Sequence, residues 1–417
     1  MSKLQELINK LCPNGVEFKP LGDISNLSRG KVYGKDYISE HRGEYPVFSS
    51  QTVNDGELGK IDTYDYDGFY LTWTTDGAYA GTIFYRQGKF SITNVCGLIS
   101  LKVNFINLKF LYYWLSIEAP KHVYYGMGNP KLMSNQMTSI MIPVPPIEVQ
   151  EEIVRILDSF SDYAAELQAE LQARKQQYEY YRNLLLTFNP SAYGCGTDDE
   201  QKDGVTTWEG HNYKIEWKKM GEIGTFIRGK RFVRTDIMEQ GVPCIHYGDM
   251  YTYYGLYTNN TPTFLKEEKA QKMRFAQKND IVIVAAGENK DDLGNAVAWL
   301  GEKPAAVHDA CFIFRSNLYP NYISHICRSH NYHKQIKMFA NEAKICSVSG
   351  QDLQKVLIPV PEYELKIKIA SILDRFETLV NDLTNGLPAE IAAVKDQYEY
   401  YRNKLLTFKK LSARANF

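Results

Sequence analysis

Three residues in the second half of the chain have side chains that could hold a divalent metal ion for hydrolysis. Asp280 opens an apolar run, and Glu288 and Lys290 follow within ten residues. Carboxylates grouped in this way bind Mg²⁺ in many nucleases. The spacing here is loose, however, and the first half of the chain offers no counterpart. We therefore predict that Asp280 starts a strand, that the other two residues lie on a loop, and that no metal is bound.

A second group of potential metal ligands lies further along the chain. Four residues with suitable side chains fall within nine positions, namely His325, Cys327, His330 and His333. Imidazole and thiolate groups are common ligands of Zn²⁺. The segment 322–339 nevertheless has the pattern of a helix, and the matching helical patch of the first half, 110–115, has none of these ligands. A packed or solvated helix is the better interpretation, so we predict no metal, no catalytic residues and no cofactor in this chain.

Basic and amide side chains on predicted loops are stronger candidates for binding. Segment 228–234, Arg-Gly-Lys-Arg-Phe-Val-Arg, holds four cations in seven residues. Lys and Arg neutralise phosphates, whereas Arg, Asn and Gln carry the paired groups that match base edges, so this chemistry permits contacts with DNA. The alternative for each residue is an ordinary solvated side chain. The candidates of the first half are Arg29, Lys31, Tyr33, Lys35, Gln51, Tyr124, Tyr125, Asn129 and Lys131, and those of the second half are Arg228, Lys230, Arg231, Arg234, His246, Tyr247, Asn289 and Lys290.

These candidates must be positioned by a framework that the chain contains twice. Ile142-Pro-Val-Pro145 returns 216 residues later at 358–361, and Gln177-Tyr-Glu-Tyr-Tyr-Arg-Asn183 returns 220 residues later at 397–403. A solenoid repeat would be only about 20 to 50 residues long. The spacing instead predicts a duplicated domain with its own helix, and a duplicated binding unit points to a target with two parts.

The segment after each Pro-Val-Pro motif predicts a long helix. Between Val149 and Phe188, seam positions recur in steps of four and three, and only Arg174 is charged. This is the heptad pattern of a coiled coil, and forty residues of helix would be about 60 Å long. An ordinary buried amphipathic helix is the alternative for one copy alone. We predict that the two helical regions pair through Leu167, Leu171, Tyr178, Tyr181, Leu185, Ile391, Val394, Tyr398, Tyr401 and Leu405.

The second helical region contains a break. Its seam stops at Leu383 and resumes at Leu387 with a shift equal to four inserted residues. The shift falls on Asn385-Gly-Leu-Pro388, where Gly is a stop signal and Pro is a start signal for helices. We predict two helices or one sharply kinked helix here, and the sequence leaves open whether the first helical region is continuous.

The globular units mix short β-like runs with a late helical patch. The clearest runs are 68–73, 81–85, 280–284 and 310–314. The units are divergent copies, because 16–24 resembles 215–223 and Arg29-Gly-Lys31 matches Arg228-Gly-Lys230. A shared scaffold with different loops would suit two readers of different targets. Segment 189–210, with Gly194-Cys-Gly196 and Asp198-Asp-Glu200, predicts a polar linker.

Composition permits nucleic-acid binding without requiring it. The net charge is −1, but residues 148–188 hold 4 basic against 8 acidic residues, while residues 201–361 hold 21 against 17. The acid therefore lies on the helical segments, and the globular units are mildly basic. No apolar run approaches the ~20 residues that span a bilayer, so no membrane contact is expected. Seven Cys without a Cys-x-x-Cys pair favour a reducing cytoplasm.

Taken together, these features resemble the specificity subunit of type I restriction–modification systems. The similarity is carried by the two Ile-Pro-Val-Pro junctions, the helix start at 148–158, the twin Gln-Tyr-Glu-Tyr-Tyr-Arg-Asn boxes and Asn385-Gly-Leu-Pro-Ala-Glu-Ile391. It covers the whole chain in the order of the family, namely domain, helix, domain, helix. The first copy lacks the Asn-Gly-Leu-Pro element at 164–171, so the resemblance does not imply equal helix lengths.

The resemblance implies a mixed α/β (α+β) fold with two target-recognition domains and a pseudo-two-fold, antiparallel coiled coil that sets the distance between the halves of a split DNA site. It implies a non-catalytic chain that recruits two methyltransferase subunits, which carry S-adenosylmethionine, and motor/nuclease restriction subunits. The expected division is 1–147 for the first target-recognition domain, 148–190 for its helical region, 191–212 for a linker, 213–362 for the second target-recognition domain and 363–417 for its helical region.

Two rival hypotheses remain open at the level of residues. The chain could be a non-catalytic interaction scaffold whose duplicated domains bind protein or glycan. It could also be an enzyme that uses Asp280, Glu288 and Lys290. Salt-dependent DNA binding together with the methyltransferase partner would separate the first rival from a DNA reader. Mg²⁺-dependent cleavage by the lone chain would support the second.

Overall fold

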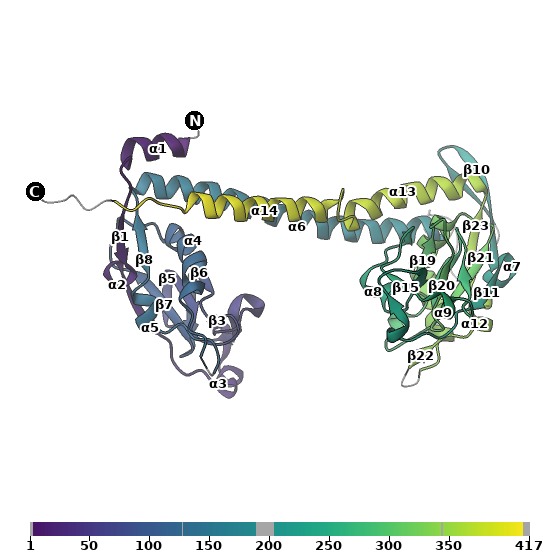
Figure 1. Ribbon diagram of the computed structural model, residues 1–417, viewed down its shortest axis with the longest axis horizontal. Helices are drawn as coiled ribbons and strands as arrows, with labels where there is room; N and C mark the ends of the chain where they lie inside the picture. Colours follow the sequence, from purple (N-terminus) through teal and green to yellow (C-terminus); the bar gives the residue numbers. More distant parts are fainter. Residues whose placement is uncertain (1–2, 127, 189–203, 343–344, 412–417) are drawn as a thin grey trace, which may run out of the picture. The chain divides into compact units, whose positions relative to one another are not determined.

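The chain forms two compact units in the computed structural model, which describes residues 3–126, 128–188, 204–342 and 345–411. One unit comprises Met1–Glu166 with Ile391–Phe417, and the other comprises Leu167–Glu390. Each contains one globular domain of mixed helices and strands together with part of the helical regions (Figure 1). None of the helices built from the described residues is long and apolar enough to cross a membrane.

The globular domain of the first unit is built on one six-stranded sheet. Neighbouring strands are antiparallel except β3 and β6, which pair in parallel. The β-like runs predicted at 68–73 and 81–85 overlap two of these strands. In spatial order the strands are β2 (Ser25–Arg29), β7 (Cys96–Leu101), β5 (Tyr66–Thr74), β6 (Ile83–Ile92), β3 (Arg42–Phe48) and β4 (Glu57–Ile61).

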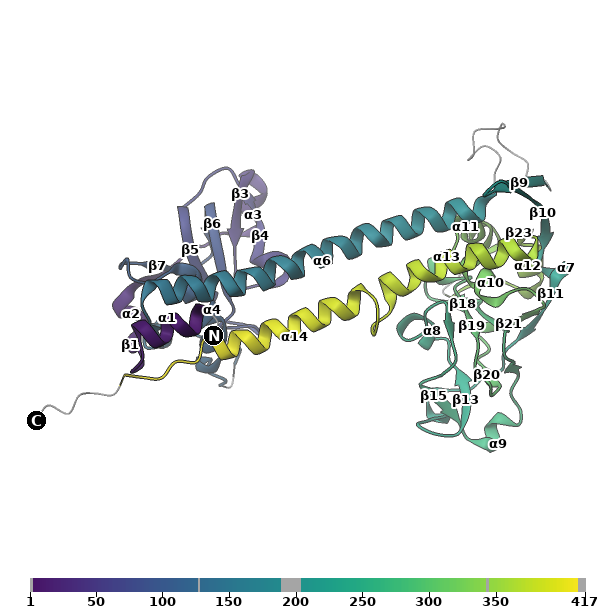
Figure 2. The same cartoon turned by 90° about the horizontal axis from the view of Figure 1, so that it is seen from above.

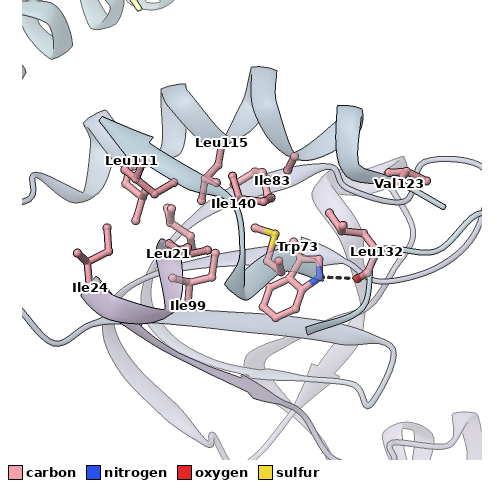
Figure 3. Close-up of a cluster of buried hydrophobic side chains, with 14 of the residues drawn as sticks. Leu21, Ile24, Trp73, Ile83, Ile99, Leu111, Leu115, Val123, Leu132 and Ile140 are labelled. Atoms are coloured by element: carbon pink, nitrogen blue, oxygen red, sulfur yellow. Dashed lines mark hydrogen bonds between the residues drawn. The ribbon is translucent and has the colours of Figure 1, made fainter. Parts of the chain in front are cut away.

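Helix α4 (Leu108–Glu118) packs on this sheet and closes the core. The Asn107 side chain caps the helix by accepting hydrogen bonds from two backbone N–H groups of its first turn. Leu111 and neighbouring apolar side chains gather around Trp73, which is completely buried (Figure 3). The indole Nε1 donates to the Leu132 carbonyl at 3.0 Å, so this buried donor is satisfied and the chain segment at 132 is fixed against the sheet.

The globular domain of the second unit contains two five-stranded sheets. The predicted runs at 280–284 and 310–314 both contribute strands. Every side chain of β17 and β19 is buried, which explains why these strands are apolar at each position instead of alternating. The first sheet has the order β11 (Gly224–Arg228), β21 (Cys311–Ser316), β17 (Ile281–Val284), β19 (Ala296–Trp299) and β14 (Tyr257–Thr258), and the second has the order β12 (Ile237–Met238), β15 (Thr263–Leu265), β13 (Val242–Ile245), β20 (Ala305–Val307) and β16 (Phe275–Ala276).

The helical stretch predicted over 322–339 is two helices, not one. Helix α10 spans Pro320–Ile326 and helix α11 spans His330–Phe339. Ser329 lies between them, and its hydroxyl accepts the backbone N–H of Tyr332. Serine is a strong N-cap residue, so a new helix starts here, and the prediction missed this start signal.

Part of the predicted linker is a strand. β9 (Gly204–Trp208) pairs antiparallel with β10 (His211–Lys219). The turn between them consists of Glu209 and Gly210, whose φ angles are 50° and 78°. Two consecutive residues with positive φ make the tight turn that matches the twist of paired strands. The polar loop predicted over 189–210 thus contains strand β9, and its residues 189–203, including Gly194-Cys-Gly196, lie outside the described residues. The assignment of 191–212 as a linker stays a prediction.

Each Ile-Pro-Val-Pro motif forms a strand that leads into a helical region. β8 (Met141–Val144) pairs with β1 (Glu17–Pro20), and β23 (Leu357–Pro361) pairs with β10. Both motif strands have only one neighbour in their sheets. Proline lacks an N–H group, so an edge position allows it to sit in a strand without losing a ladder hydrogen bond.

The two helical regions differ in continuity. The first is a single helix, α6 (Ile147–Thr187), whereas the second is divided into α13 (Tyr363–Asn381) and α14 (Leu387–Leu405). The predicted break at 385–388 is thus confirmed. Asp382 holds the break, because its Oδ1 accepts the backbone N–H groups of Thr384 at 2.7 Å and of Asn385 at 3.2 Å.

The helical regions pair with each other in antiparallel order. In the first unit, Phe160 of α6 stacks on Tyr401 of α14 with ring centroids 5.5 Å apart. In the second, Tyr181 of α6 stacks on Phe376 of α13 at 5.7 Å. Early α6 thus lies beside the later C-terminal helix, and late α6 lies beside the earlier one (Figures 1 and 2). Each Phe stacks on the Tyr of the other copy, which is the reciprocal pattern of a two-fold contact.

Most of the seam residues predicted from the heptads are shielded from solvent. Six of them are buried, three are half-buried, and one is 39% exposed. The buried ones are Leu167, Leu171, Tyr178, Leu185, Ile391 and Val394, the half-buried ones are Tyr181, Tyr398 and Leu405, and the exposed one is Tyr401.

An aspartate fixes the first globular domain to its helix. Asp158 of α6 accepts a hydrogen bond from the Tyr113 hydroxyl at 2.6 Å and pairs with the Lys109 ammonium at 2.6 Å, and both partners belong to α4. Burial, and next to it the bond to Asp158, raise the pKa of the Tyr113 hydroxyl. The helix that closes the core of the domain is therefore also the helix that holds it to α6.

Candidate nucleic-acid interface

The turn Thr93–Cys96, between β6 and β7, is the centre of the candidate interface in the first unit. Arg29 ends β2 beside it and donates from Nη1 to the Asn94 carbonyl at 3.1 Å. Two residues later the backbone N–H of Lys31 donates to the Ile92 carbonyl at 3.2 Å. The last residues of β2 are thus tied to both sides of this turn.

A second loop, after β3, meets the same turn. The Val95 carbonyl accepts hydrogen bonds from the hydroxyls of Ser50 and Thr75, the latter at 2.7 Å. Next to them the Thr93 hydroxyl donates to Ser49 at 3.2 Å. Gln51 is exposed at this loop, and its amide donates to a backbone carbonyl within the loop. The candidates Arg29 and Gln51 therefore approach one turn from different strands.

Arg86 stabilises this loop, a role that no sequence pattern indicated. Its side chain is 3% exposed, and it donates to the Asp55 carboxylate at 2.5 Å and to the Asp55 carbonyl at 2.7 Å. The guanidinium lies 3.6 Å from the centre of the Phe48 ring. Burial lowers the pKa of Arg86, while Asp55 opposes that shift. Asn54 and Asp55 both have φ of 52°, an unfavourable conformation that Arg86 holds in place.

The third loop carries the exposed tyrosines. Tyr124 and Lys131 exchange backbone hydrogen bonds of 2.8 and 3.0 Å, and the next residue, Leu132, donates to the Thr75 carbonyl at 2.9 Å. Tyr124 is 64% and Tyr125 is 75% exposed. Asn129 and Lys131 are exposed as well. These four candidates thus lie beside the end of β5, at the same end of the sheet as Arg29 and Gln51.

Of the three remaining candidates in the first unit, two have side chains that already bind a partner. Lys31 forms an ion pair with Asp65, and the Tyr33 hydroxyl donates to the same carboxylate at 2.6 Å. The hydrogen bond to Asp65 is the main reason why the pKa of Lys31 is raised. Lys35 is exposed at the start of α3 (Lys35–Glu40).

The second unit repeats the backbone frame of this site. Arg228 ends β11 and donates from Nε to the Asp309 carbonyl at 3.0 Å. The next N–H groups, of Gly229 and Lys230, donate to the Cys311 and Val307 carbonyls at 2.9 Å each. A Cβ on Gly229 would lie 2.1 Å from a backbone oxygen, and one on Gly30 would lie 1.9 Å from another. The shared Arg-Gly-Lys motif is explained by this close approach of two backbone segments.

Aromatic rings and imidazoles fill the space beside this frame in the second unit. His308 lies 5.0 Å from Phe232, 4.9 Å from His246 and 5.3 Å from Tyr247, measured between ring centroids. His308 Nδ1 accepts from the Ala310 N–H at 3.2 Å, so its other nitrogen carries the proton and donates to the Phe232 carbonyl at 3.1 Å. Burial lowers the pKa of His308 and of His246. His308 was absent from the predicted set.

The polar candidates of the second unit differ in whether their side chains already have partners. Lys230, Arg231 and Arg234 are exposed, and their side chains make no hydrogen bond or ion pair with any residue that the structure describes. Lys290, by contrast, forms an ion pair with Glu342, and the Asn289 side chain caps a short helical turn. Arg274 was also missed by the sequence analysis, and it donates to the Arg228 carbonyl at 2.7 Å.

The potential metal ligands in the second unit have ordinary partners. Asp280 accepts hydrogen bonds from Arg315 at 2.6 Å and from the Gln277 N–H at 2.7 Å, where it precedes β17 as predicted. His325 is fully buried and lies 2.8 Å from Asp374 and 3.2 Å from the Tyr178 hydroxyl. Within the described ranges, no three His, Cys, Asp or Glu residues are grouped so as to hold a metal ion.

A family model matches both halves of the chain. The model describes the type I restriction modification DNA specificity domain, and it matches residues 13–174 and 213–393. These two ranges include both sheet ends described above, α6 as far as residue 174, and α13 with the start of α14.

Curated relatives show the same similarity. A putative type I specificity subunit of Mycoplasma pneumoniae, S.MpnORF507P, is 31% identical over 385 residues, which cover 92% of this chain and 95% of the relative. A second, S.MpnORF89P, is 31% identical and covers 84% of this chain and 97% of the relative. The type I restriction enzyme MpnII specificity subunit is 43% identical over 190 residues, which cover 44% of this chain and 57% of that protein.

Two solved structures share the fold over nearly the full length. The type I restriction–modification system S subunit from M. genitalium has a TM-score of 0.53 at 14% identity, covering 99% of this chain and all of its own. A chain from a structure on complex assembly and conformational transition of the type I R-M system has a TM-score of 0.57 at 15% identity, covering 95% and 98%. The predicted mixed fold with paired long helices is thereby confirmed.

Proposed function

Because the chain belongs to the type I restriction–modification DNA specificity family, we propose that it is the subunit that reads a bipartite DNA sequence. Each globular domain would read one half of the site through the end of its main sheet. The observation that carries this proposal is the repetition of one Arg-Gly-Lys frame in both family-matched halves.

The chemistry of the two sheet ends supports contact with a duplex. The second unit offers Lys230, Arg231 and Arg234 as uncommitted cations, which suit phosphates. The first offers exposed amides and tyrosines, such as Gln51 and Tyr124, which suit base edges and sugars. The matching family model describes a DNA specificity domain, so the proposed role is recognition and not cleavage.

The proposed complex assigns the chemistry to other chains. Two methyltransferase subunits would hold S-adenosylmethionine, and motor/nuclease subunits would act on unmethylated DNA. One similar protein is named as the specificity subunit of a restriction enzyme, that is, as one component of it. A chain that reads DNA for such partners would act in the cytoplasm.

Methylation mapping together with DNA binding tests the proposal. The chain, assembled with methyltransferase subunits encoded beside it, should methylate one bipartite sequence in a genome that carries the genes. Its binding to that duplex should weaken as salt rises, with a slope near one per phosphate contact. Methylation that is independent of this chain, or an absence of any two-part motif, would contradict the proposed function.

A further inference from the structure

The central turn of the candidate interface has the same backbone bonds in both units. In the first unit, the Thr93 N–H donates to the Phe48 carbonyl, and in the second the His308 N–H donates to the Ile245 carbonyl. Each bond joins the turn to the end of the strand that carries the second loop. Matching these bonds equates Thr93 with His308.

Two more bonds extend the match over the whole turn. The Gly30 N–H donates to the Cys96 carbonyl as that of Gly229 does to Cys311. Arg29 and Arg228 then donate to the carbonyls of Asn94 and Asp309. These two acceptors are each two residues before the matching Cys, so Asn94 and Asp309 occupy one structural position. The sequence carried this signal as Asn94-Val-Cys96 and Asp309-Ala-Cys311.

This position lies at the junction of every loop that carries candidate DNA contacts. Its own carbonyl is held by the Arg of the basic loop. The residue that follows, Val95 or Ala310, accepts from the residue that follows the central strand, Thr75 or Ala285. That same residue binds the third loop through the N–H of Leu132 or Val348 at 2.9 Å. A side chain here is therefore placed at the centre of the interface by a rigid frame, as selective contacts require.

Both side chains at this position reach solvent, and neither makes a hydrogen bond within the described ranges. Asn94 is exposed, and its amide makes no hydrogen bond with the residues of the described ranges. Asp309 has a side chain 35% exposed, and its Oδ1 lies 3.3 Å from His308 Nδ1. That nitrogen accepts the Ala310 N–H, so it holds no proton for the carboxylate. Asp309 is thus a free acceptor in a basic surface.

We propose that Asn94 and Asp309 are the base-reading pair of the two domains. The inference rests on the proposed function and adds the chemistry of one base in each half-site. An Asn amide can pair with the N6 and N7 edge of adenine, whereas a carboxylate can only accept, so it favours the N4 amino group of cytosine. An acidic residue would repel phosphates, so a partly exposed carboxylate among cations fits a donor on a base and not a phosphate.

Exchange of the two side chains tests this proposal. Asn94→Asp and Asp309→Asn keep the size of the side chain and change only its donors and acceptors. The variants, assembled with the methyltransferase subunits, are used for methylation mapping and for rates on duplexes that differ at single positions. Each should change preference at one base by about 5- to 150-fold, in the half-site of its own domain only. Asn104→Asp, an exposed substitution beyond the other end of β7, should change nothing.

The outcomes are distinct. A change confined to one position of one half-site supports the proposal, and the unchanged other half shows that the variant is folded and assembled. An unaltered motif with unaltered rates overturns it, as does a uniform loss over all sequences. If the wild-type chain directs methylation to a two-part motif but neither variant changes it, this inference fails while the proposed function stands.

Discussion

The two sheet ends share a backbone frame but hold different side chains. Arg29 and Arg228 make the same kind of bond to the same turn, and the Gly that follows each is required by the close approach of another backbone segment. Around this frame the first unit places hydroxyls and amides, whereas the second places imidazoles and uncommitted cations. Bonds between backbones thus fix the geometry and leave the side chains free to differ, which is how one scaffold can serve two targets.

A second comparison concerns how each globular domain is attached to its helix. Asp158 and Asp374 are repeat equivalents, 216 residues apart. Asp158 binds Tyr113 and the half-exposed Lys109, whereas Asp374 binds the fully buried His325 and Asn321. The same carboxylate position therefore holds a buried phenol and a half-exposed ammonium in one unit, and a buried imidazole in the other.

The largest effect should come from removing these carboxylates. Asp374→Ala leaves the buried His325 without its acceptor and should lower the free energy of unfolding by about 3 kcal/mol. Asp158→Ala should cost less, about 2 kcal/mol, because the buried Tyr113 hydroxyl loses its acceptor while Lys109 can turn to water. Urea denaturation of the full chain, with hydrogen exchange to locate the loss, measures both. Asp374→Asn keeps an acceptor and serves as the control. Equal losses in the two units would show that the buried imidazole depends on its carboxylate no more than the buried phenol does.

Substitution of the two shared glycines should have the next largest effect on stability. Gly30→Ala and Gly229→Ala each force a Cβ against a backbone oxygen, so each should destabilise its own unit by about 2 kcal/mol. Half-site recognition by that domain should be lost with it. Gly34→Ala is the matched control, because no atom lies within 4 Å of the added Cβ. Normal stability of either variant would refute the common frame.

Mild acid should destabilise the second unit before the first. Burial holds the pKa of His333 at about 4, well below the usual value of 6.5. A histidine whose pKa is lowered by folding contributes stability above its unfolded pKa, and this stability is lost as the pH falls from 6.5 toward 4. The loss at pH 5 should be about 2 kcal/mol. In the first unit, hydrogen bonds from Arg155 and Lys3 hold the pKa of Glu152 at about 2, so its contribution is lost only below about pH 4.5.

Hydrogen exchange between pH 7 and pH 5 measures this difference. Protection should fall in 204–361 and persist in 13–146. His333→Gln should remove most of the loss in the second unit, and His211→Gln, at an exposed position, should not. Loss of protection that begins in the first unit would contradict this prediction.

The smallest effects should come from single surface cations. Lys230→Ala, Arg231→Ala and Arg234→Ala should each reduce the salt slope of DNA binding by about one unit. Lys31→Ala should reduce it by less, because Asp65 already holds that ammonium. Salt titrations of the assembled methyltransferase provide the slopes, with Lys219→Ala at the far side of β11 as the control. An unchanged slope in the triple variant would mean that this loop faces away from DNA.

The sequence alone determined the parts of this protein that depend on short-range pattern. The heptads from Val149 to Phe188 predicted a long helix, and the shift at 385–388 predicted its counterpart's break, because both signals repeat within a few turns. The duplicated boxes predicted the family and its order of domains. Local signals also existed for the helix cap at Ser329 and for the turn at Glu209-Gly210. They were missed because neither belongs to a periodic pattern of apolar residues.

Only the tertiary structure decided which loops meet. The carbonyls of Asn94 and Asp309 accept from Arg29 and Arg228, which are 65 and 81 residues away in the chain. Arg86 reaches Asp55 across 31 residues. Such contacts follow from strand pairing over long separations, and no periodic pattern encodes them. The sequence could therefore supply candidate residues on loops, while the pairing of β2 with β7 and of β11 with β21 selected the turn around which those loops gather.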